Sequence, residues 1–255
     1  AAPKIPIQVW STQGRFVSVD EACAEPMRVA AANWHALATF AGRFAPQGAA
    51  LLMDIGSTTT DIIPLWQGRP APRGLTDPER LLSQELIYTG VRRTPVCAVM
   101  QTGIASELFA TMQDVYLVLK RVPEDPGSRD TADGRPATRA ASHARLARMV
   151  CADAEHCTWS QALRLAQQAH RRQVHQIAAA LPKVAAALPA PPAFVILSGA
   201  GEFLARAVLK SCAQLRGYRV LSLQKKLSPA VSSAACAHAL AMLAREKCRN
   251  RQAAH

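Results

Sequence analysis

Apolar residues along this chain fall into short continuous runs and into longer stretches with helical spacing. Residues 49–53 are continuously apolar, residues 62–65 follow after a polar turn, and residues 194–197 form a third run. Runs of this length are typical of strands that are buried on both faces. Helical spacing is found over residues 26–44, 138–152, 159–180, 203–212 and 229–247. These patterns predict an α/β domain with a mixed sheet, in which ligands lie at the strand ends.

The remaining segments predict shorter elements. A hairpin is expected from residues 5–10 and 15–19, which flank a polar turn. Thr76 followed by a proline and early acidic residues predicts the start of a short helix, in which Leu81 and Leu82 pack. Further strands are predicted at 96–100, 115–119 and 218–223, a short helix at 107–112, a long loop at 122–142 and an interruption of the long helix at Pro182.

Composition narrows the class of protein. The 255 residues suit one large domain or two small ones, and an apolar content of 49% is that of an ordinary globular protein. Seven cysteines at irregular spacing predict no disulfide framework. No apolar run reaches the ~20 residues that span a bilayer. We therefore expect a reduced, cytoplasmic protein without a membrane partner.

The net charge of +12 invites a nucleic-acid interpretation. However, the basic residues are scattered, aromatic residues make up only 5% of the chain, and no pattern of alternating aromatic and basic residues is present. Nucleic acid is therefore disfavoured as a partner. A small anionic substrate would use a local share of the charge.

The polar turn between the first two apolar runs carries the candidate chemistry. Gly56 allows a sharp turn, and Ser57, Thr58 and Thr59 offer hydroxyls and backbone N–H groups suited to phosphate oxygens. The acidic residues that bracket the turn suit Mg²⁺, which binds one or two carboxylates together with water and substrate oxygens; they are Asp54 and Asp61. The alternative is an ordinary polar hairpin turn with incidental acids.

Two further segments suggest anion binding. The adjacent residues Arg92 and Arg93 follow a glycine in a loop, where they form either a diphosphate clamp or a solvated basic turn. After the apolar run at 194–197, the residues Gly199, Gly201 and Glu202 open a helix, as in an anion or nucleotide corner. A lone Gly-x-Gly is weak support.

Asn33 lies off its helical stripe, and His143, Cys151, His156 and Cys157 fit no usual zinc spacing.

Several of these motifs together resemble a known family. The hairpin at 54–61 resembles the second phosphate-binding loop of the actin-like, sugar-kinase and Hsp70-type ATPase fold. Within that fold the chain resembles the hydantoinase/oxoprolinase-related branch, and most nearly the furanylmethanamine synthases of methanofuran biosynthesis. The resemblance covers most of residues 30–153, through the segments 30–36, 88–97, 106–111, 131–136 and 145–153.

The resemblance implies a transferase of tetrahydromethanopterin-linked one-carbon metabolism. Such an enzyme couples an aminomethylfuran methyl diphosphate to the phenol of a tyramine derivative, with release of diphosphate. It implies that Mg²⁺ lies near Asp54 and Asp61. It identifies no base for the phenol, for which Glu85 and Asp133 are the candidates. It further implies substrate or phosphate contacts from Asn33, Arg92, Arg93, Thr131, Arg135, Gly199, Gly201 and Glu202, with the loop around 131–135 acting as a lid. The alternatives are an ATP-dependent kinase or hydrolase of the same fold, with ATP as cofactor, and a non-catalytic assembly subunit.

One departure from the family affects the expected domains. The fold has two similar halves, and the phosphate loop that begins the first half does not precede Asp54. We expect residues 1–48 to be a remnant of the first half, and residues 49–255 to form the phosphate-binding domain with an inserted segment at about 70–145. A truncated or split protein is implied, with a homodimer or a separate N-terminal half as partner.

Overall fold

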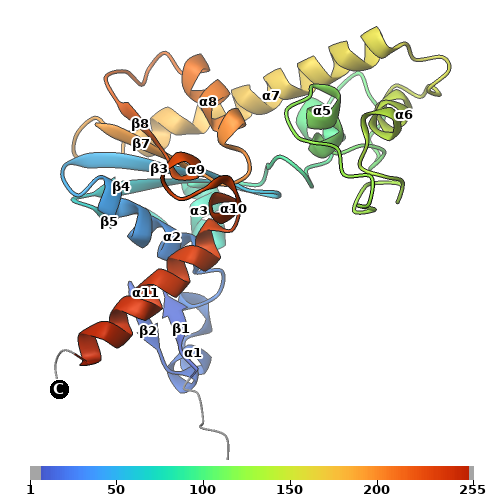
Figure 1. The fold of residues 1–255 in the computed structure, drawn as a ribbon. Coiled ribbons are helices and arrows are strands. Elements are labelled where there is room, and N and C mark those ends of the chain that lie inside the picture. The colour runs from blue at the N-terminus through green and yellow to red at the C-terminus, as the bar shows by residue number, and fades with distance from the viewer. Residues whose placement is uncertain (1–6, 253–255) are drawn as a thin grey trace, which may run out of the picture.

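A mixed β-sheet with helices on both faces forms the body of the protein (Figure 1). The computed structural model describes residues 7–252. The strand order is β5-β4-β3-β7-β8, and the short β6 also pairs with β4. The strands are β3 (Ala49–Ile55), β4 (Thr60–Trp66), β5 (Arg69–Pro70), β6 (Leu86–Ile87), β7 (Phe194–Ser198) and β8 (Arg219–Ser222).

The central strand β3 is buried on both faces, as the continuous apolar run predicts. It pairs antiparallel with β4 and parallel with β7, so that Asp54 lies opposite both Asp61 and Ser198. Successive side chains of a strand point to opposite faces. Leu51 and Met53 pack into one hydrophobic core and Leu52 into the other. The sheet is therefore the middle of three layers.

Two sets of helices cover the sheet. Helices α7 (Trp159–Ala185) and α8 (Glu202–Ser211) pack on one face. The other face is covered by α2 (Asn33–Ala41), α9 (Leu223–Lys226) and α11 (Ala235–Gln252). This arrangement confirms the predicted α/β class with a mixed sheet. No helix in the described range 7–252 is long and apolar enough to cross a membrane.

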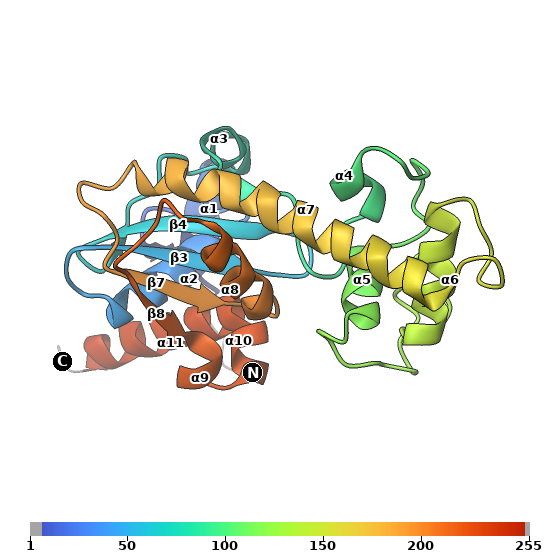
Figure 2. The same ribbon diagram turned by 90° about the horizontal axis from the view of Figure 1, so that it is seen from above.

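A helical lobe lies beside the sheet and shares α7 with it (Figure 2). It contains α4 (Val96–Met100), α5 (Met112–Val118), α6 (Arg139–Met149) and the N-terminal part of α7. Its polar core is the fully buried guanidinium of Arg145, which pairs with Asp114 at 2.7 Å and with Asp133 at 2.9 Å. Asp133 thereby ties the loop before α6 to the lobe.

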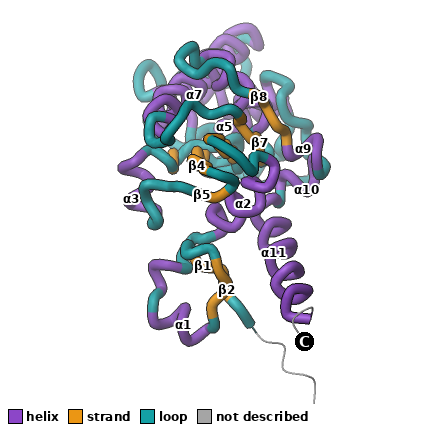
Figure 3. Tube along the Cα trace, turned by 90° about the vertical axis from the view of Figure 1, so that its left-hand side faces the viewer, coloured by secondary structure: helices purple, strands orange, loops and turns teal. Residues whose placement is uncertain are grey.

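The N-terminal segment packs beside the last helix (Figure 3). It comprises β1 (Val9–Ser11), β2 (Arg15–Val17), α1 (Val19–Ala24) and the 3₁₀ turn Pro26–Arg28. Trp10 shares a small core with Leu243 of α11. The predicted hairpin is thus confirmed but short, and residues 5 and 6 of its prediction lie outside the described residues.

Several predicted elements were wrong. Residues 96–100 and 115–118 are helical rather than strands, residue 119 is a turn, and 107–111 form no helix. The predicted helix at 26–44 is broken by the left-handed backbone of Ala31, with φ of 53°. Helix α7 continues past Pro182, and the C-terminal helix is divided into α10 (Pro229–Ser233) and α11. The short helix α3 (Asp77–Ser83) begins at Thr76 as expected, but Leu81 and Leu82 are exposed rather than packed.

Candidate functional site

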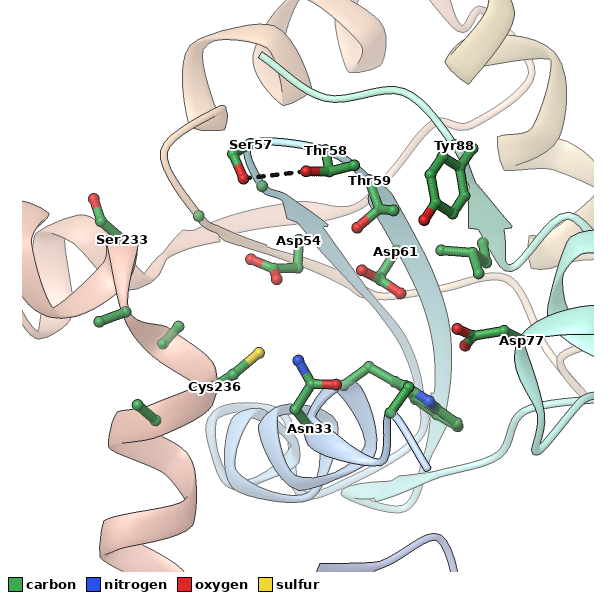
Figure 4. A pocket seen from close by; sticks show the side chains of 18 of the residues that line it. Asn33, Asp54, Ser57, Thr58, Thr59, Asp61, Asp77, Tyr88, Ser233 and Cys236 are labelled. Carbon is green, nitrogen blue, oxygen red and sulfur yellow. Dashed lines mark hydrogen bonds between the residues drawn. The ribbon is translucent and has the colours of Figure 1, made fainter. Parts of the chain in front are cut away.

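The turn between β3 and β4 opens onto a cleft of about 490 Å³ (Figure 4). The turn residues Gly56 to Thr59 form one wall together with Gly199. The N-terminus of α2, helix α3 and the junction of α10 with α11 form the others. Asp54 and Asp61 lie at the ends of their strands and point into this space. The sheet therefore brings the predicted hydroxyl turn and both predicted carboxylates to one place.

The turn presents donors to the cleft. The backbone N–H of Gly56 donates to the carbonyl of Thr59 at 2.9 Å and closes the turn. The hydroxyls of Ser57 and Thr58 lie 3.4 Å apart. Among the described residues, the backbone N–H groups of Ser57, Thr58 and Thr59 donate to no other group of the chain. Such a concave set of free N–H groups and hydroxyls is suited to an anion.

A loop from the other side holds the turn in place. The backbone N–H groups of Arg92 and Arg93 both donate to the carbonyl of Ser57, at 3.0 and 2.8 Å, and Val91 N–H donates to the carbonyl of Gly56 at 3.0 Å. A Cβ atom on Gly90 would lie 2.6 Å from backbone atoms of the turn. Only glycine allows this approach, so the loop supports the turn through its main chain.

A buried glutamine fixes that loop to α7. The Gln173 amide donates to Thr89 Oγ1 and to the carbonyl of Gly90, both at 2.8 Å. Its Oε1 accepts a hydrogen bond from the Tyr116 hydroxyl of the lobe, and the Thr60 hydroxyl of β4 donates to the carbonyl of Thr89 at 2.8 Å. All polar atoms of this amide side chain are therefore engaged. The turn rests on a satisfied buried network, which is the kind that makes a structure rigid.

Asp54 is the carboxylate that lacks a partner. Its Oδ1 oxygen is buried and accepts no hydrogen bond within the described chain. Burial raises the pKa of Asp54 to about 7, and the neighbouring charge of Asp61 adds to the rise. The hydroxyl of Ser198, opposite Asp54 in the sheet, is also buried without a partner. A Cβ atom on Gly199 would lie 2.8 Å from Asp54 Oδ1. A buried, unsatisfied carboxylate of this kind is a candidate ligand for a cation.

Asp61, in contrast, is paired with a buried arginine. Arg80 of α3 donates to Asp61 Oδ1 at 2.6 Å and lies 3.8 Å from Asp77. Its guanidinium carbon is 3.9 Å from the centre of the Trp34 ring, a cation–π arrangement. Burial raises the pKa of Asp61, while the charge of Arg80 opposes that rise.

The charges of the cleft suit a divalent cation. Three carboxylates line it, from Asp54, Asp61 and Asp77, against the single guanidinium of Arg80. An anion alone would meet net negative charge here, whereas an anion accompanied by a cation would not. No group of three or more acidic, histidine or cysteine side chains in the described residues could hold a metal by itself. Mg²⁺ needs no such cage, because it takes one or two carboxylates and completes its shell with water and substrate oxygens.

Other predicted site residues divide into those near the cleft and those away from it. Asn33 lines the cleft. Gly201 precedes α8 and packs against the Ile55 side chain. The buried Glu202 accepts from the Ser222 hydroxyl at 2.6 Å and from a backbone N–H of α9 at 2.9 Å, so its carboxylate joins two elements of the sheet edge. The Arg92 side chain pairs with Asp130 at 3.1 Å.

The residues predicted as bases or as parts of the lid form hydrogen bonds or ion pairs outside the cleft. Glu85 is buried, and its carboxylate accepts from the backbone N–H groups of residues 73 and 74, at 2.7 and 3.1 Å. Asp133 pairs with Arg145 and Arg148 in the lobe. Thr131 donates its hydroxyl to the carbonyl of Arg135 at 2.7 Å. None of these three residues lines the cleft, and neither do the exposed Arg93 and Arg135.

Sequence reasoning missed several cleft residues. Arg80 and Asp77 lie on a short helix, and the pattern there indicates only a helix start. Residues 232–237, where α10 meets α11, also line the cleft. Among them Cys236 has a pKa raised above its usual range, chiefly by burial and then by the charges of the nearby carboxylates. The small residues Ser232 to Ala235 interrupt the helical pattern of residues 229–247. This interruption is the only local feature of the sequence from which this wall of the cleft could have been predicted.

Comparisons with known proteins identify relatives of this chain. A model of the hydantoinase/oxoprolinase family matches residues 1–247. Two relatives are each named (4-{4-[2-(gamma-L-glutamylamino)ethyl]phenoxymethyl}furan-2-yl)methanamine synthase. The protein from Methanocaldococcus jannaschii is 29% identical over 246 residues, 93% of this chain and 72% of its own length. The protein from Methanococcus vannielii is 29% identical over 201 residues, 76% of this chain and 89% of its own length.

A solved structure gives the fold. The nucleotide-free structure of acetone carboxylase, an enzyme of ATP-dependent acetone carboxylation, matches with a TM-score of 0.62 at 14% identity. The match covers 92% of this chain and 35% of the carboxylase chain, so the present chain corresponds to about a third of that protein. The likeness confirms the predicted actin-like ATPase fold.

Proposed function

The chain belongs to the hydantoinase/oxoprolinase family, and from this premise we propose that it is a Mg²⁺-dependent transferase that displaces diphosphate. By likeness to the two synthases, it would join the methyl carbon of an aminomethylfuran methyl diphosphate to the phenol oxygen of a tyramine derivative. The product would be an aryl ether like the phenoxymethylfuran in the relatives' name. The reaction would serve methanofuran-type synthesis in tetrahydromethanopterin-linked one-carbon metabolism.

The observation that carries this proposal is the cleft between the hydroxyl turn and Asp54. The turn supplies free N–H groups and hydroxyls for the oxygens of a diphosphate, and Asp54 Oδ1 supplies an unpartnered carboxylate opposite them. Bound Mg²⁺ would neutralise the negative charge that grows on the leaving diphosphate. Asp54 would hold the ion, and Asp61 would add its charge while keeping its bond to Arg80.

In this reaction the bond between the furan methyl carbon and diphosphate would break, with its electron pair leaving on the diphosphate. A bond from that carbon to the phenol oxygen would form, and the phenol proton would pass to the departing diphosphate. Neither Glu85 nor Asp133 lines the cleft, and both carboxylates already accept hydrogen bonds from the chain. The proposal therefore rests on stabilisation of the leaving group by fixed donors, which is usually the largest catalytic contribution.

The test is diphosphate release from the two substrates in the presence of Mg²⁺, with two matched variants. D54N removes the unpartnered carboxylate, and we expect a loss of about a hundredfold or more in rate. D77N removes a charge from the same cleft at a residue that is about half exposed, and we expect activity within a few fold of wild type. Absence of release by the wild-type protein, or equal losses in the two variants, would contradict the proposal.

The ATP-dependent alternative has one structural observation in its favour. Gly199, at the end of β7, approaches the carbonyl of Ile55 so closely that an added Cβ would lie 2.3 Å from it. This brings the start of α8 beside the hydroxyl turn, as a nucleotide corner would require. Calorimetry with ATP and Mg²⁺ separates the two functions, because tight binding with ATP turnover would favour a kinase or hydrolase over the transferase.

A further inference from the structure

A second cavity, of about 660 Å³, lies on the helical lobe. Its walls are the end of α5 with the residues that follow, the first residue of α6, and the exposed side of α7 between Trp159 and Arg171. Figure 2 shows these three helices side by side in the lobe. The cavity shares no lining residue with the cleft.

The lining of this cavity is strongly cationic. It contains Lys120, Arg121, Arg139 and Arg171, and no aspartate or glutamate. Within the described part of the chain, none of these four side chains forms an ion pair. Elsewhere in the same lobe the buried Arg145 is neutralised by two carboxylates. Hence the fold compensates its buried charge but leaves the cations of this cavity without counter-charge.

Arg139 gives the clearest sign of a missing acceptor. Its Nε atom is buried and donates to no group of the described chain. Its guanidinium carbon lies 4.9 Å from the centre of the Trp159 ring, which holds the side chain against a flat apolar wall. A buried donor without an acceptor destabilises a protein. An anionic oxygen brought by a ligand would satisfy it.

His170 lies near the same uncompensated positive charges. It is half-buried and lines the cavity, with its Nδ1 3.4 Å from the Tyr116 hydroxyl. Burial lowers the pKa of His170, and the positive charges of Arg121 and Arg171 lower it further. Both arginines are therefore close enough to act on one ring, although they lie on different segments.

We propose that this cavity binds a small organic anion that carries two or more phosphate or carboxylate groups. Cavities of 300–1,000 Å³ with a few convergent polar groups are typical of small-molecule sites. Arginine forks match carboxylate and phosphate oxygens. The Trp159 ring with Val118, Leu119 and Leu163 offers an apolar face for the rest of the ligand. A nucleic acid is less suited, because the cations surround a hollow. The lining also contains a single tryptophan and no phenylalanine or tyrosine, so successive bases would have no series of rings to stack on.

The test is calorimetric titration of the full chain with inorganic tripolyphosphate and, separately, with citrate, in metal-depleted buffer at constant ionic strength. Removing Mg²⁺ separates this site from the cleft, whose proposed ligand needs the metal. We expect saturable binding of one of the probes, and the stronger probe identifies phosphate or carboxylate as the preferred group. Quenching of tryptophan fluorescence that disappears in W159F gives a second readout at the cavity itself.

The decisive variants differ only in which charges they remove. R121Q/R171Q takes two exposed cations from the cavity, whereas R164Q/R172Q takes two exposed cations from α7 outside the lining. We expect the first pair to weaken binding at least about tenfold, because two charge-assisted contacts are lost, and the second to leave it nearly unchanged. Thermal melting confirms that both variants fold, and R139Q provides a single-site check.

Three results would overturn the proposal. The first is the absence of saturable binding for both probes. The second is an equal loss in the two double variants, which would show a general effect of net charge. The third is tight binding of a single-stranded oligonucleotide that neither probe displaces, which would assign the cations to nucleic acid instead.

Discussion

The pair formed by Arg80 and Asp61 allows a quantitative test of how the cleft is held together. The Arg80 side chain is 1% exposed and that of Asp61 13% exposed, with 2.6 Å between nitrogen and oxygen. In R80M the carboxylate stays buried without its cation, and breaking such a pair typically costs about 3–5 kcal/mol. That is a large part of the ~5–15 kcal/mol by which a domain of this kind is stable.

The loss should depend on pH. Without Arg80, burial and then the charge of Asp77 hold the folded pKa of Asp61 above the unfolded value of 3.8. The folded state then favours the protonated acid, so the penalty is small near pH 4, grows as the pH rises above the unfolded value, and is complete above the folded pKa. D61N lacks the charge at every pH and keeps the contact of Arg80 with the Trp34 ring. Because Asp77 still lies 3.8 Å from the Arg80 guanidinium in D61N, we expect this variant to cost less, about 1–3 kcal/mol, without this pH dependence.

Urea unfolding of wild type, R80M, D61N and the double variant at pH 5 and pH 8, followed by circular dichroism, measures these energies. The double variant should lose less than the sum of the two single losses, because it leaves no unpaired charge. R69M, at an exposed arginine of β5, serves as control and should lie within about 0.5 kcal/mol of wild type. An R80M protein within about 1 kcal/mol of wild type at pH 8, or additive losses, would refute the account of the pair.

Three further predictions concern the support of the site. G90A should displace the hydroxyl turn and destabilise the fold by about 1–3 kcal/mol in urea unfolding, whereas G127A, with its nearest neighbour at 3.4 Å, should not. Q173L should cost about 2–4 kcal/mol, because the buried Tyr116 hydroxyl and the carbonyl of Gly90 lose their partner; a neutral effect would show that water replaces the amide. Burial and then the charge of Arg80 lower the pKa of His35 from 6.5 to about 4. Stability should therefore hold above about pH 6.5 and fall by about 3 kcal/mol toward pH 4, an effect that H35Q removes.

The sequence was most informative where local pattern and burial agree. The apolar run at 49–53 is buried because β3 is the central strand, and the Gly-Ser-Thr-Thr turn falls where two strands have to reverse. The strand at 194–197 and the helix after it follow the same rule. In each case a single stretch of chain contains both the hydrophobic pattern and the residues that end it.

The errors arose where the decisive partner is distant in sequence. Residues 96–100 and 115–118 are valine-rich runs too short to show a helical period, and packing in the lobe makes them helical. The capping pair of Thr111 and Asp114 before α5 was the available signal. Arg80 could not be found from pattern, because its role depends on Asp61 and Trp34, which come from two other elements.

The hydrogen bonds of Gln173 limit how the cleft can close. The chain passes from the sheet to the lobe through the loop after β6 and returns along α7, and this one amide joins the two crossings. The lobe therefore has no free hinge where it meets the hydroxyl turn. Closure of the cleft around a ligand would have to come from its other walls. At one of them Ala234 divides α10 from α11, which gives the chain a point where it can bend.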